Sequence, residues 1–364
     1  MAQVQSSCEA ATVSSVAGRS SVREYRPRSA DDSVVRQVVL DHVETFFEEA
    51  RRRGGLGVSE FVRRAFYKMI DCGCLAKGFA RFRCSACGFD RFVPFSCKVR
   101  QLCSSCSARR MMALSAHLVD SVFPEVPVRQ WVFTLPYPLR YEVAWNHGRH
   151  KEVLALFIEA LSDSYREAAE AQGIADGRTG AVTAVQRVGS ALNLNPHFHV
   201  VAIDGVFFRN PADQLEFAPL AQLTDEDVAQ LVATVRQRVL AMLQRDGADD
   251  NHSGFLFDPL QDESPSLAGI YSASVQGRVA MGRRAGRRVL RVGAEPNAPW
   301  VTSRTPLQAH VQGFDLHAAV AVEAGDRERL ERLCRYLLRP PVVEDRLELQ
   351  DDGRISLELK TPYW

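Results

Sequence analysis

The sequence has 364 residues, of which 46% are hydrophobic and 24% are charged, and its formal net charge is +1. These values are ordinary for a globular protein and leave room for two or three domains. No apolar run approaches the ~18 residues of a membrane-spanning helix, and residues 1–30 lack the apolar core of a signal peptide. We therefore expect neither a membrane protein nor a secreted one. A disordered tail is expected over 1–30, and the nine cysteines favour metal binding or reduced thiols over disulfides.

The near-neutral total hides a strongly basic segment. Residues 51–110 hold 14 Lys or Arg but only three acids, a net charge of +11, so the rest of the chain is near −10. A second cluster without acids contains Arg278, Arg283, Arg284, Arg287, Arg288 and Arg291. Basic segments in a near-neutral protein indicate local binding of a polyanion, although a solvated surface has the same composition. Both interpretations stay open for each segment.

The N-terminal part is predicted to be helical around a cysteine-rich segment. Helices are predicted over residues 33–52, 59–70 and 107–121. The first has Asp32 or Ser33 as its candidate N-terminal cap. Because Pro124 and Pro127 follow the third helix, we place a domain boundary there. The resulting units are a tail over 1–30, an N-terminal domain over 31–125 and a second domain over 126–364.

Beyond this boundary the pattern becomes a mixture of strands and helices. Strands are predicted over Val128–Leu135, Ala181–Val188, His197–Ile203 and Asp315–Val322. Helices are predicted over residues 151–172, 225–244 and 326–339. Thr224 is the candidate cap of the second helix, and Pro340-Pro341 stop the third because proline blocks helix continuation. The short connection between the second and third strands predicts a hairpin.

Four cysteines have the spacing of a zinc site. Cys84 and Cys87 form one C-x2-C pair, and Cys103 and Cys106 form another after 15 intervening residues. Zn²⁺ takes four thiolates in a tetrahedron, and each pair supplies two of them, so the sequence predicts a zinc ribbon. The role of the remaining three cysteines, Cys72, Cys74 and Cys97, stays open between a second site and buried thiols.

Aromatic and basic residues alternate around these cysteines. The aromatic residues are Phe79, Phe82, Phe89, Phe92 and Phe95, and the cations are Arg81, Arg83, Arg91, Lys98, Arg100, Arg109 and Arg110. Cations for phosphates and rings for bases are typical of a nucleic-acid surface. The alternative is that the phenylalanines form the small core of the ribbon, and we favour that interpretation for most of them.

Two histidines stand on the third predicted strand. His197 and His199 are two residues apart, so on a strand both point to the same face and could begin a site for a divalent metal. A second feature lies on the predicted helix 326–339, where Arg332, Tyr336 and Arg339 share one face. A tyrosine among guanidinium groups has a phosphate-binding environment that favours its anion, as a nucleophile attacking DNA requires.

These motifs carry a resemblance to a known family. They are Cys84-Ser-Ala-Cys87, Phe95-Ser-Cys-Lys-Val-Arg-Gln-Leu-Cys-Ser-Ser-Cys106, Gln130-Trp-Val-Phe-Thr-Leu-Pro136, Gln186-Arg-Val-Gly-Ser-Ala-Leu-Asn-Leu-Asn-Pro-His-Phe-His199, Gly313-Phe-Asp-Leu-His-Ala318 and Leu330-Glu-Arg-Leu-Cys-Arg-Tyr-Leu-Leu-Arg-Pro-Pro341. In this order they resemble the rolling-circle insertion-sequence transposases, which carry an N-terminal transposase zinc-binding domain and belong to the His-hydrophobic-His (HUH) endonuclease superfamily. The resemblance spans roughly residues 30–364.

The resemblance implies an α+β fold, with N-terminal helices and a zinc ribbon followed by a central antiparallel sheet with flanking helices. It implies that His197 and His199 bind the catalytic metal and that Tyr336 is the nucleophile. Some members carry a second tyrosine, but the position four before Tyr336 is Arg332, so this is a single-tyrosine form. The family continues past a Lys-Thr-Pro-Tyr stretch, whereas this sequence stops at Trp364, which indicates a C-terminal truncation.

The implied activity is metal-assisted nicking and rejoining of single-stranded DNA at insertion-sequence ends, through a 5′-phosphotyrosine intermediate. The third metal ligand is expected to be Gln186, with His317 as the alternative, and Mn²⁺ suits the imidazoles better than Mg²⁺. The expected DNA-binding residues are Lys98, Arg100, Arg109, Arg110, Arg332 and Arg339. We expect a cytoplasmic, nucleoid-associated protein whose partner is single-stranded DNA, with a homo-oligomer as a further possibility.

Two other function classes remain. A replication initiator or a relaxase would use the same chemistry, but a zinc module ahead of the histidines favours transposition. A truncated transposase that only binds DNA through its zinc module would keep the motifs without cutting.

Overall fold

The computed structural model describes residues 33–54, 57–99, 101–189, 192–249, 258–289 and 305–358. The predicted tail over 1–30, Asp32, Arg100, Arg291 and the last residues 359–364 lie outside these described residues. None of the helices in the described segments is both long and apolar enough to cross a membrane.

The predicted N-terminal helices are confirmed. Helix α1 spans Val34–Gly54, α2 spans Glu60–Ile70 and α3 spans Ser104–His117. The Ser33 hydroxyl accepts a hydrogen bond from the backbone N–H of Arg36 at 3.1 Å, so Ser33 caps α1 as expected. Helices α1 and α2 pack through the ring of Phe47, which meets Phe66 edge-on with centroids 5.7 Å apart.

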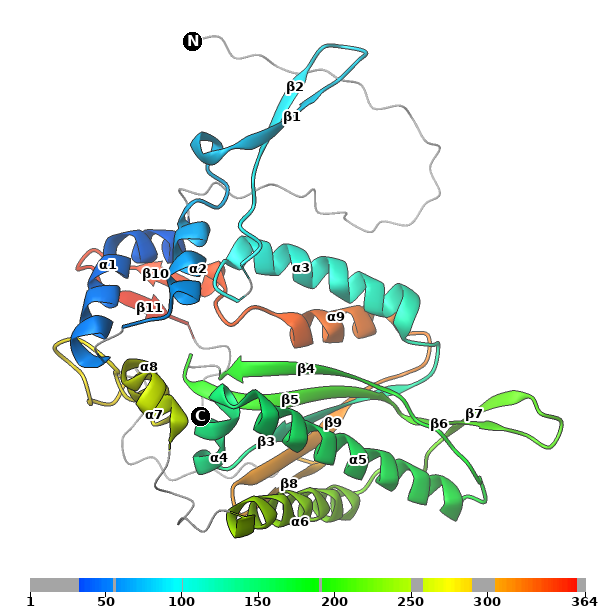
Figure 1. Ribbon diagram of the computed structural model, residues 1–364. Coiled ribbons are helices and arrows are strands. Elements are labelled where there is room, and N and C mark those ends of the chain that lie inside the picture. The colour runs from blue at the N-terminus through cyan, green and yellow to red at the C-terminus, as the bar shows by residue number, and fades with distance from the viewer. Residues whose placement is uncertain are drawn as a thin grey trace.

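A two-stranded hairpin joins α2 to α3. Its strands are β1, Phe79–Arg83, and β2, Asp90–Pro94, and among the described strands they pair only with each other. Figure 1 shows this hairpin extending away from the rest of the molecule, on the far side of α3 from the central sheet. The predicted ribbon is therefore present only in part, because Cys84 and Cys87 lie on this hairpin whereas Cys103 and Cys106 lie at the start of α3.

The second part of the chain folds around a five-stranded antiparallel sheet. Its strands stand in the order β4-β5-β3-β9-β8, with bounds β3 Val128–Thr134, β4 Ala181–Val188, β5 Leu194–Ile203, β8 Gln308–Val311 and β9 Phe314–Val322. Strand β5 is buried from Pro196 to Ile203, as its mostly apolar sequence, interrupted by the two histidines, predicts. Strands β4 and β5 form the predicted hairpin.

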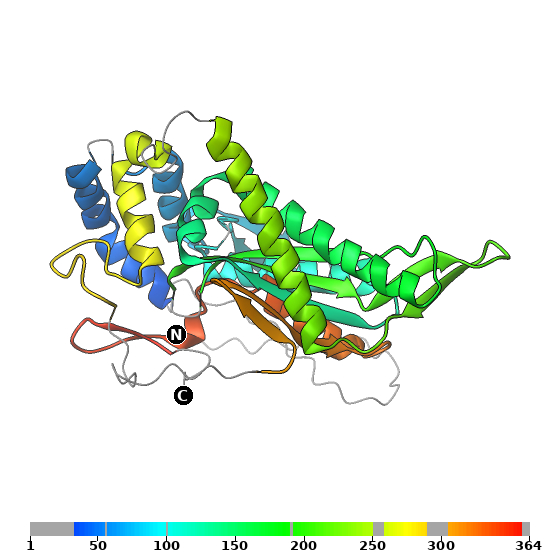
Figure 2. The same cartoon turned by 90° about the horizontal axis from the view of Figure 1, so that it is seen from below.

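Helices cover both faces of this sheet. On one face lie α5, His147–Ala171, and α6, Asp225–Asp249, which Figure 2 shows crossing the sheet side by side. On the other face lie α3 and α9, Arg327–Leu338 (Figure 1). The Phe133 and Phe198 rings belong to the core under α5 and α6. Val201 belongs to the second core, under α9. The predicted α+β architecture is confirmed.

Capping signals in the sequence mark the starts of two of the predicted helices of this part. The Thr224 hydroxyl accepts from the Asp227 N–H at 3.2 Å, while the Asp227 carboxylate accepts from the Thr224 N–H at 2.8 Å, which forms a reciprocal cap at the start of α6. The Asp326 side chain accepts from the Arg329 N–H at the start of α9. Helix α9 ends at Leu338, before the two prolines.

Shorter elements were not predicted. They are α4 Tyr137–Trp145, β6 Gly205–Arg209, β7 Leu215–Pro219, α7 Pro259–Glu263, α8 Pro265–Val275, β8 Gln308–Val311, β10 Leu347–Leu349 and β11 Ile355–Leu357. Most are only three to five residues long, too short for a periodic pattern to show.

The segment after α9 returns to the N-terminal helices. The Glu344 carboxylate accepts from the hydroxyls of Ser33 at 2.6 Å and Ser104 at 2.7 Å. Those two serines lie at the starts of α1 and α3. One carboxylate therefore links the segment after α9 to the starts of two N-terminal helices, where the helix dipoles favour a negative charge.

Candidate functional site

The two histidines project from β5 toward the face that α9 covers. His197 is paired with Thr134 of β3 and His199 with Val132, so both side chains lie on one face of the sheet. Their ring centroids are 4.9 Å apart. Only 9% of His197 and 2% of His199 is exposed. The pair is thus held on a rigid strand and nearly enclosed. The sequence predicted where the two histidines lie but not how deeply they are buried.

Burial keeps both imidazoles neutral. It lowers the pKa of His197 below its ordinary value, and the guanidinium groups of Arg339 and Arg140 lower it further. It lowers the pKa of His199 to about 3, with a further contribution from His197. A neutral imidazole is the form that binds a metal.

Each histidine has a hydrogen-bond partner at Nδ1. His197 Nδ1 lies 2.6 Å from the backbone oxygen of Asn195, which can only accept, so Nδ1 carries the proton and Nε2 keeps its lone pair. His199 Nδ1 lies 2.9 Å from the side-chain amide of Gln130, a buried residue of β3. The amide atom nearest Nδ1 is Nε2 of Gln130, which can only donate, so Nδ1 of His199 accepts and its Nε2 carries the proton. A 180° turn of the Gln130 amide would present its oxygen to Nδ1 and free Nε2 of His199 for a cation.

Tyr336 lies directly over the histidine pair. Its ring meets that of His199 edge-on, with centroids 5.7 Å apart. The Arg339 guanidinium lies 4.3 Å from the centre of the same ring. Helix α9 can present Tyr336 this way because Leu330, Leu333, Cys334 and Leu337 are buried on its other side, as its apolar stripe predicted. Tyr336 remains 37% exposed, so a ligand can reach it.

Gln186 connects β4 to the end of α9. It is paired with His197 across the two strands, so it belongs to the same face. Its Nε2 donates to the backbone oxygens of Tyr336 at 3.3 Å and Leu337 at 3.0 Å. The amide therefore satisfies carbonyls that the helix end leaves unpaired, and its Oε1 is the atom that a cation could take.

His317 is farther from the pair. It lies on β9, paired with Val132 on the opposite side from His199, so a whole strand separates it from β5. Within the described segments, the one group of three or more His, Cys, Asp or Glu ligand atoms close enough to share a metal consists of cysteines, and His317 does not join His197 and His199 in such a group. This placement favours Gln186 over His317 as the third ligand.

Two residues of this site were missed in the sequence. Gln130 is 4% exposed on an otherwise apolar face of β3, and a lone amide in a buried strand is the signal that could have revealed it. Arg140 follows β3 on α4, donates to the backbone oxygen of Leu135 at 2.7 Å and is close enough to His197 to depress its pKa. Nothing in the local pattern distinguishes Arg140 from a surface arginine.

The clustered cysteines differ from the predicted set. The Sγ atoms of Cys72, Cys97, Cys103 and Cys106 all lie within 4.8 Å of one another. Cys103 and Cys106 were expected there, but their partners are Cys72 and Cys97, in place of Cys84 and Cys87. The reason is the hairpin: β1 and β2 carry Cys84 and Cys87 to its exposed tip, while its two ends bring Cys72 and Cys97 together beside the start of α3.

This cluster fits a zinc ion. Cys106 is 3.6 Å from both Cys72 and Cys97, and Cys103 is 3.6 Å from Cys72. A tetrahedron with Zn–S bonds near 2.3 Å has sulfur–sulfur edges of about 3.8 Å. A hydrogen bond from the Cys103 thiol also lowers the pKa of Cys72 to about 7, toward the thiolate that a metal needs. The four thiols are thus arranged for tetrahedral coordination.

The phenylalanines of the hairpin do not form a core. Phe82, Phe89 and Phe95 are 58–60% exposed, and Phe79 and Phe92 are 44% and 49% exposed. The favoured interpretation that these rings pack into a small core is therefore wrong. A hairpin of two five-residue strands has no second layer to cover them.

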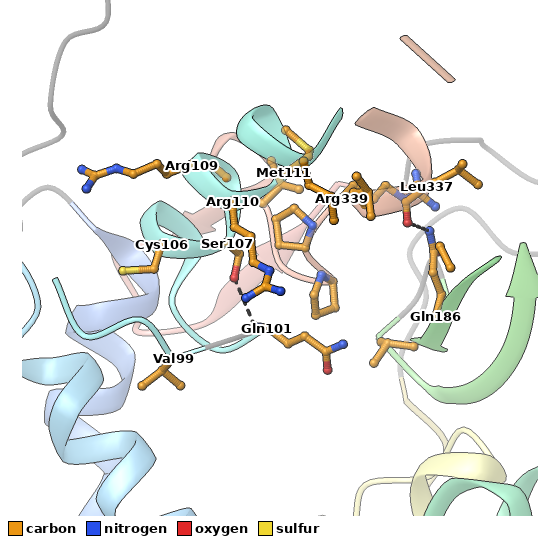
Figure 3. Close-up of a pocket in the computed structure, with 18 of the residues that line it drawn as sticks. Val99, Gln101, Cys106, Ser107, Arg109, Arg110, Met111, Gln186, Leu337 and Arg339 are labelled. Carbon is orange, nitrogen blue, oxygen red and sulfur yellow. Dashed lines mark hydrogen bonds between the residues drawn. The ribbon is translucent and has the colours of Figure 1, made fainter. Parts of the chain in front are cut away.

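A cavity of about 900 Å³ lies between α3, β4 and the segment after α9. Gln186 and Arg339 line it on the side of the histidine pair, and Cys106 lines it on the side of the cysteine cluster. In Figure 3, Arg110 points from α3 toward Gln101, whereas Arg109 extends away from the cavity. Lys98 also lines the cavity. Arg332 is exposed one turn before Tyr336 on α9, and Arg100 lies outside the described residues.

Comparisons with known families agree with this arrangement. A family model described as "Putative transposase" matches residues 180–363, half of the chain, and includes the histidine pair and Tyr336. A second model, described as "Transposase zinc-binding domain", matches residues 40–135 and includes all four clustered cysteines. The chain belongs to the putative transposase family.

The predicted resemblance to insertion-sequence transposases with an N-terminal zinc-binding domain is thereby confirmed. The zinc-binding domain and the four-cysteine cluster together support a structural Zn²⁺ in this transposase. No curated protein and no solved structure was found to match the transposase.

Proposed function

We propose that this transposase nicks and rejoins single-stranded DNA at insertion-sequence ends, with Tyr336 as the nucleophile. One observation carries the proposal: the Tyr336 ring lies against His199 and under Arg339, so a phenol, two neutral imidazoles and a cation converge on one place. Convergence of a nucleophile with metal-binding groups at an exposed position is what phosphoryl transfer to tyrosine requires.

The residues that would hold the catalytic metal are His197, His199 and Gln186. His197 offers Nε2 and Gln186 offers Oε1 from neighbouring strands of one sheet, and His199 offers Nε2 when the Gln130 amide turns its oxygen toward Nδ1. Two nitrogens and one oxygen suit Mn²⁺, although the abundance of Mg²⁺ in cells favours it as the working ion. A divalent cation bound there would polarise a non-bridging oxygen of the scissile phosphate.

The covalent step uses the Tyr336 oxygen. This oxygen attacks phosphorus and loses its proton, a bond from phosphorus to the tyrosine forms, and the bond from phosphorus to the 3′ oxygen breaks. The 3′ oxygen leaves as a hydroxyl after gaining a proton, and the 5′ phosphate stays esterified to Tyr336. Rejoining is the reverse attack by a 3′ hydroxyl. The number of phosphodiester-type bonds is unchanged, so the cycle needs no nucleotide cofactor.

Two guanidinium groups stabilise the phosphate during this step. Arg339 stands over the Tyr336 ring, and both Arg339 and Arg140 act electrostatically on His197. Fixed cations near the place where charge develops lower the barrier without reorganising. Arg332 is exposed on the same helix and would bind the neighbouring backbone. The cavity beside Gln186 continues this basic lining toward Lys98 and Arg110, and it provides a route for the strand between the two domains.

A nicking assay tests the proposal. A labelled single strand carrying an element end is incubated with the transposase and Mn²⁺, then separated on a denaturing gel. The expected result is a shortened strand with a free 3′ hydroxyl and a protein-linked 5′ fragment, both absent when EDTA is added. Nicking without any protein-linked fragment would contradict the tyrosine mechanism. A protein that binds the strand but leaves it intact in Mn²⁺ and in Mg²⁺ would identify a DNA-binding remnant.

A further inference from the structure

The hairpin of β1 and β2 has two unlike faces. Because the strands pair in register, Phe79, Arg81 and Arg83 lie on one face with Pro94, Phe92 and Asp90. On that face the rings of Phe79 and Phe92 meet edge-on, 5.1 Å apart. Arg81 makes two hydrogen bonds to the Asp90 carboxylate, at 3.0 and 2.5 Å. The groups of this first face are thus largely satisfied by one another.

The second face exposes its aromatic rings and its cation to solvent. It carries Phe82 opposite Arg91 and Ala80 opposite Val93. The Cys84 N–H bonds to the Phe89 oxygen at 2.8 Å, so the ladder continues and Phe89 falls on the same face. Phe82 and Phe89 are then diagonal neighbours across the strands, with side chains about 7–8 Å apart. Their exposed fractions are 60% and 58%.

Charge on the hairpin favours an anionic partner. Asp90 is the sole acid between Phe79 and Phe95, and Arg81 already occupies it. Among the salt bridges of the described residues, none involves Arg83 or Arg91. The exposed rings of Phe82 and Phe89 therefore flank Arg91, a cation without an acidic partner among the described residues. Guanidinium groups without an acidic partner bind phosphate oxygens well, so these arginines favour a phosphate backbone as the partner.

The hairpin is firmly anchored at its base. The Gly73 N–H bonds to the Phe95 oxygen at 3.1 Å, and the Phe95 N–H bonds to the Gly78 oxygen at 3.0 Å. These bonds lie next to Cys72 and Cys97 of the cysteine cluster. A zinc ion there would fix the direction in which the exposed tip points. Rings on a fixed support lose little entropy on binding.

We propose that Phe82, Arg91 and Phe89 form a stacking platform for single-stranded DNA. The two rings stack on successive unpaired bases, and Arg91 binds the phosphate between them. Single strands are selected because the bases of a duplex are already stacked on each other and do not offer their faces to a side chain. The proposal rests on the proposed function, since it assigns the platform to the unpaired DNA on which cleavage acts.

Binding of full-length protein tests the platform without cleavage. Fluorescence anisotropy is measured with a labelled oligothymidylate and with a duplex of equal length, without added Mn²⁺ or Mg²⁺ and without a chelator, so that zinc stays bound. Because stacking of one ring on a base contributes about tenfold or more in affinity, Phe82→Ala and Phe89→Ala should each weaken single-strand binding by about tenfold. Duplex binding should change by less than about twofold. Phe61→Ala is the matched control, because Phe61 is 82% exposed on α2 and should change neither affinity.

Further variants separate stacking from other roles. Phe82→Trp keeps a flat ring and should keep single-strand affinity, whereas Phe82→Leu keeps apolar bulk and should lose it. Zinc content, measured on every variant, should stay that of the wild type if the hairpin is intact. Equal losses on single strand and duplex, full affinity in Phe82→Leu, or a change in oligomeric state in place of affinity would each overturn the platform. Because no cut is needed, failure here leaves the role of Tyr336 separately testable.

Discussion

The side-chain amide of Gln130 lies 2.9 Å from Nδ1 of His199, in the interior between β3 and α9. This contact determines which nitrogen of His199 faces the place where a cation would bind. Losing such a partner typically weakens metal binding by about 10–100-fold. We expect Gln130→Met, which keeps the volume but removes the amide, to weaken Mn²⁺ binding by that factor in a calorimetric titration.

A second substitution distinguishes orientation of His199 from general packing. Gln130→Glu places a carboxylate oxygen against Nδ1, so it should retain Mn²⁺ affinity close to that of the wild type. In the metal-free protein, ¹⁵N spectra of the histidine side chains should show the proton of His199 on Nε2 in the wild type and on Nδ1 in Gln130→Glu. Equal Mn²⁺ affinity in Gln130→Met and the wild type would show that Gln130 does not orient His199 for metal binding.

The cysteine cluster predicts which thiols zinc requires. Cys72→Ser and Cys97→Ser should each lose the metal, because each removes one of four converging sulfurs. Cys84→Ser is the matched control, since Cys84 is exposed at the hairpin tip and outside the cluster. Elemental analysis of the purified proteins provides the measurement. Zinc lost from Cys84→Ser and retained in Cys72→Ser would restore the pairing expected from the two C-x2-C motifs.

The choice between Gln186 and His317 can be decided by metal binding. Gln186→Ala should weaken Mn²⁺ binding clearly, whereas His317→Ala, one strand farther from the pair, should leave it nearly unchanged. Gln186→Glu should keep the metal because a carboxylate is a good ligand for Mn²⁺. The same variant cannot donate to the carbonyls of Tyr336 and Leu337, so amide exchange at the end of α9 should accelerate. The reverse ranking of the two alanine variants would assign the third position to His317.

Local patterns were enough to predict the elements that carry the proposed chemistry. The apolar run after Pro196 predicted β5, and the stripe from Leu330 to Leu337 predicted the buried side of α9. Each depends on neighbours in the sequence, because strand and helix periodicities are local properties. The meeting of Tyr336 with His199 was implied by the family resemblance, since 137 positions separate them and no local pattern could bring them together.

The cysteine cluster shows where sequence spacing fails to predict which thiols meet. Two C-x2-C pairs predicted one tetrahedron, but the strands between them form a hairpin that separates Cys84 from Cys103. Which sulfurs meet is decided by the path of the chain through that hairpin, and cysteine spacing does not encode that path. The same hairpin explains the exposed phenylalanines, because in the part of the chain that the structure describes β1 and β2 pair only with each other.

The central claim is that Tyr336 attacks DNA, and removal of its hydroxyl tests it most directly. Tyr336→Phe keeps the ring against His199 and under Arg339, so Mn²⁺ binding and single-strand affinity should match those of the wild type. The measurement is the protein-linked DNA formed on a labelled element end in Mn²⁺, in a denaturing gel. The account predicts an adduct for the wild type and none for Tyr336→Phe. An adduct of wild-type yield in Tyr336→Phe would contradict it.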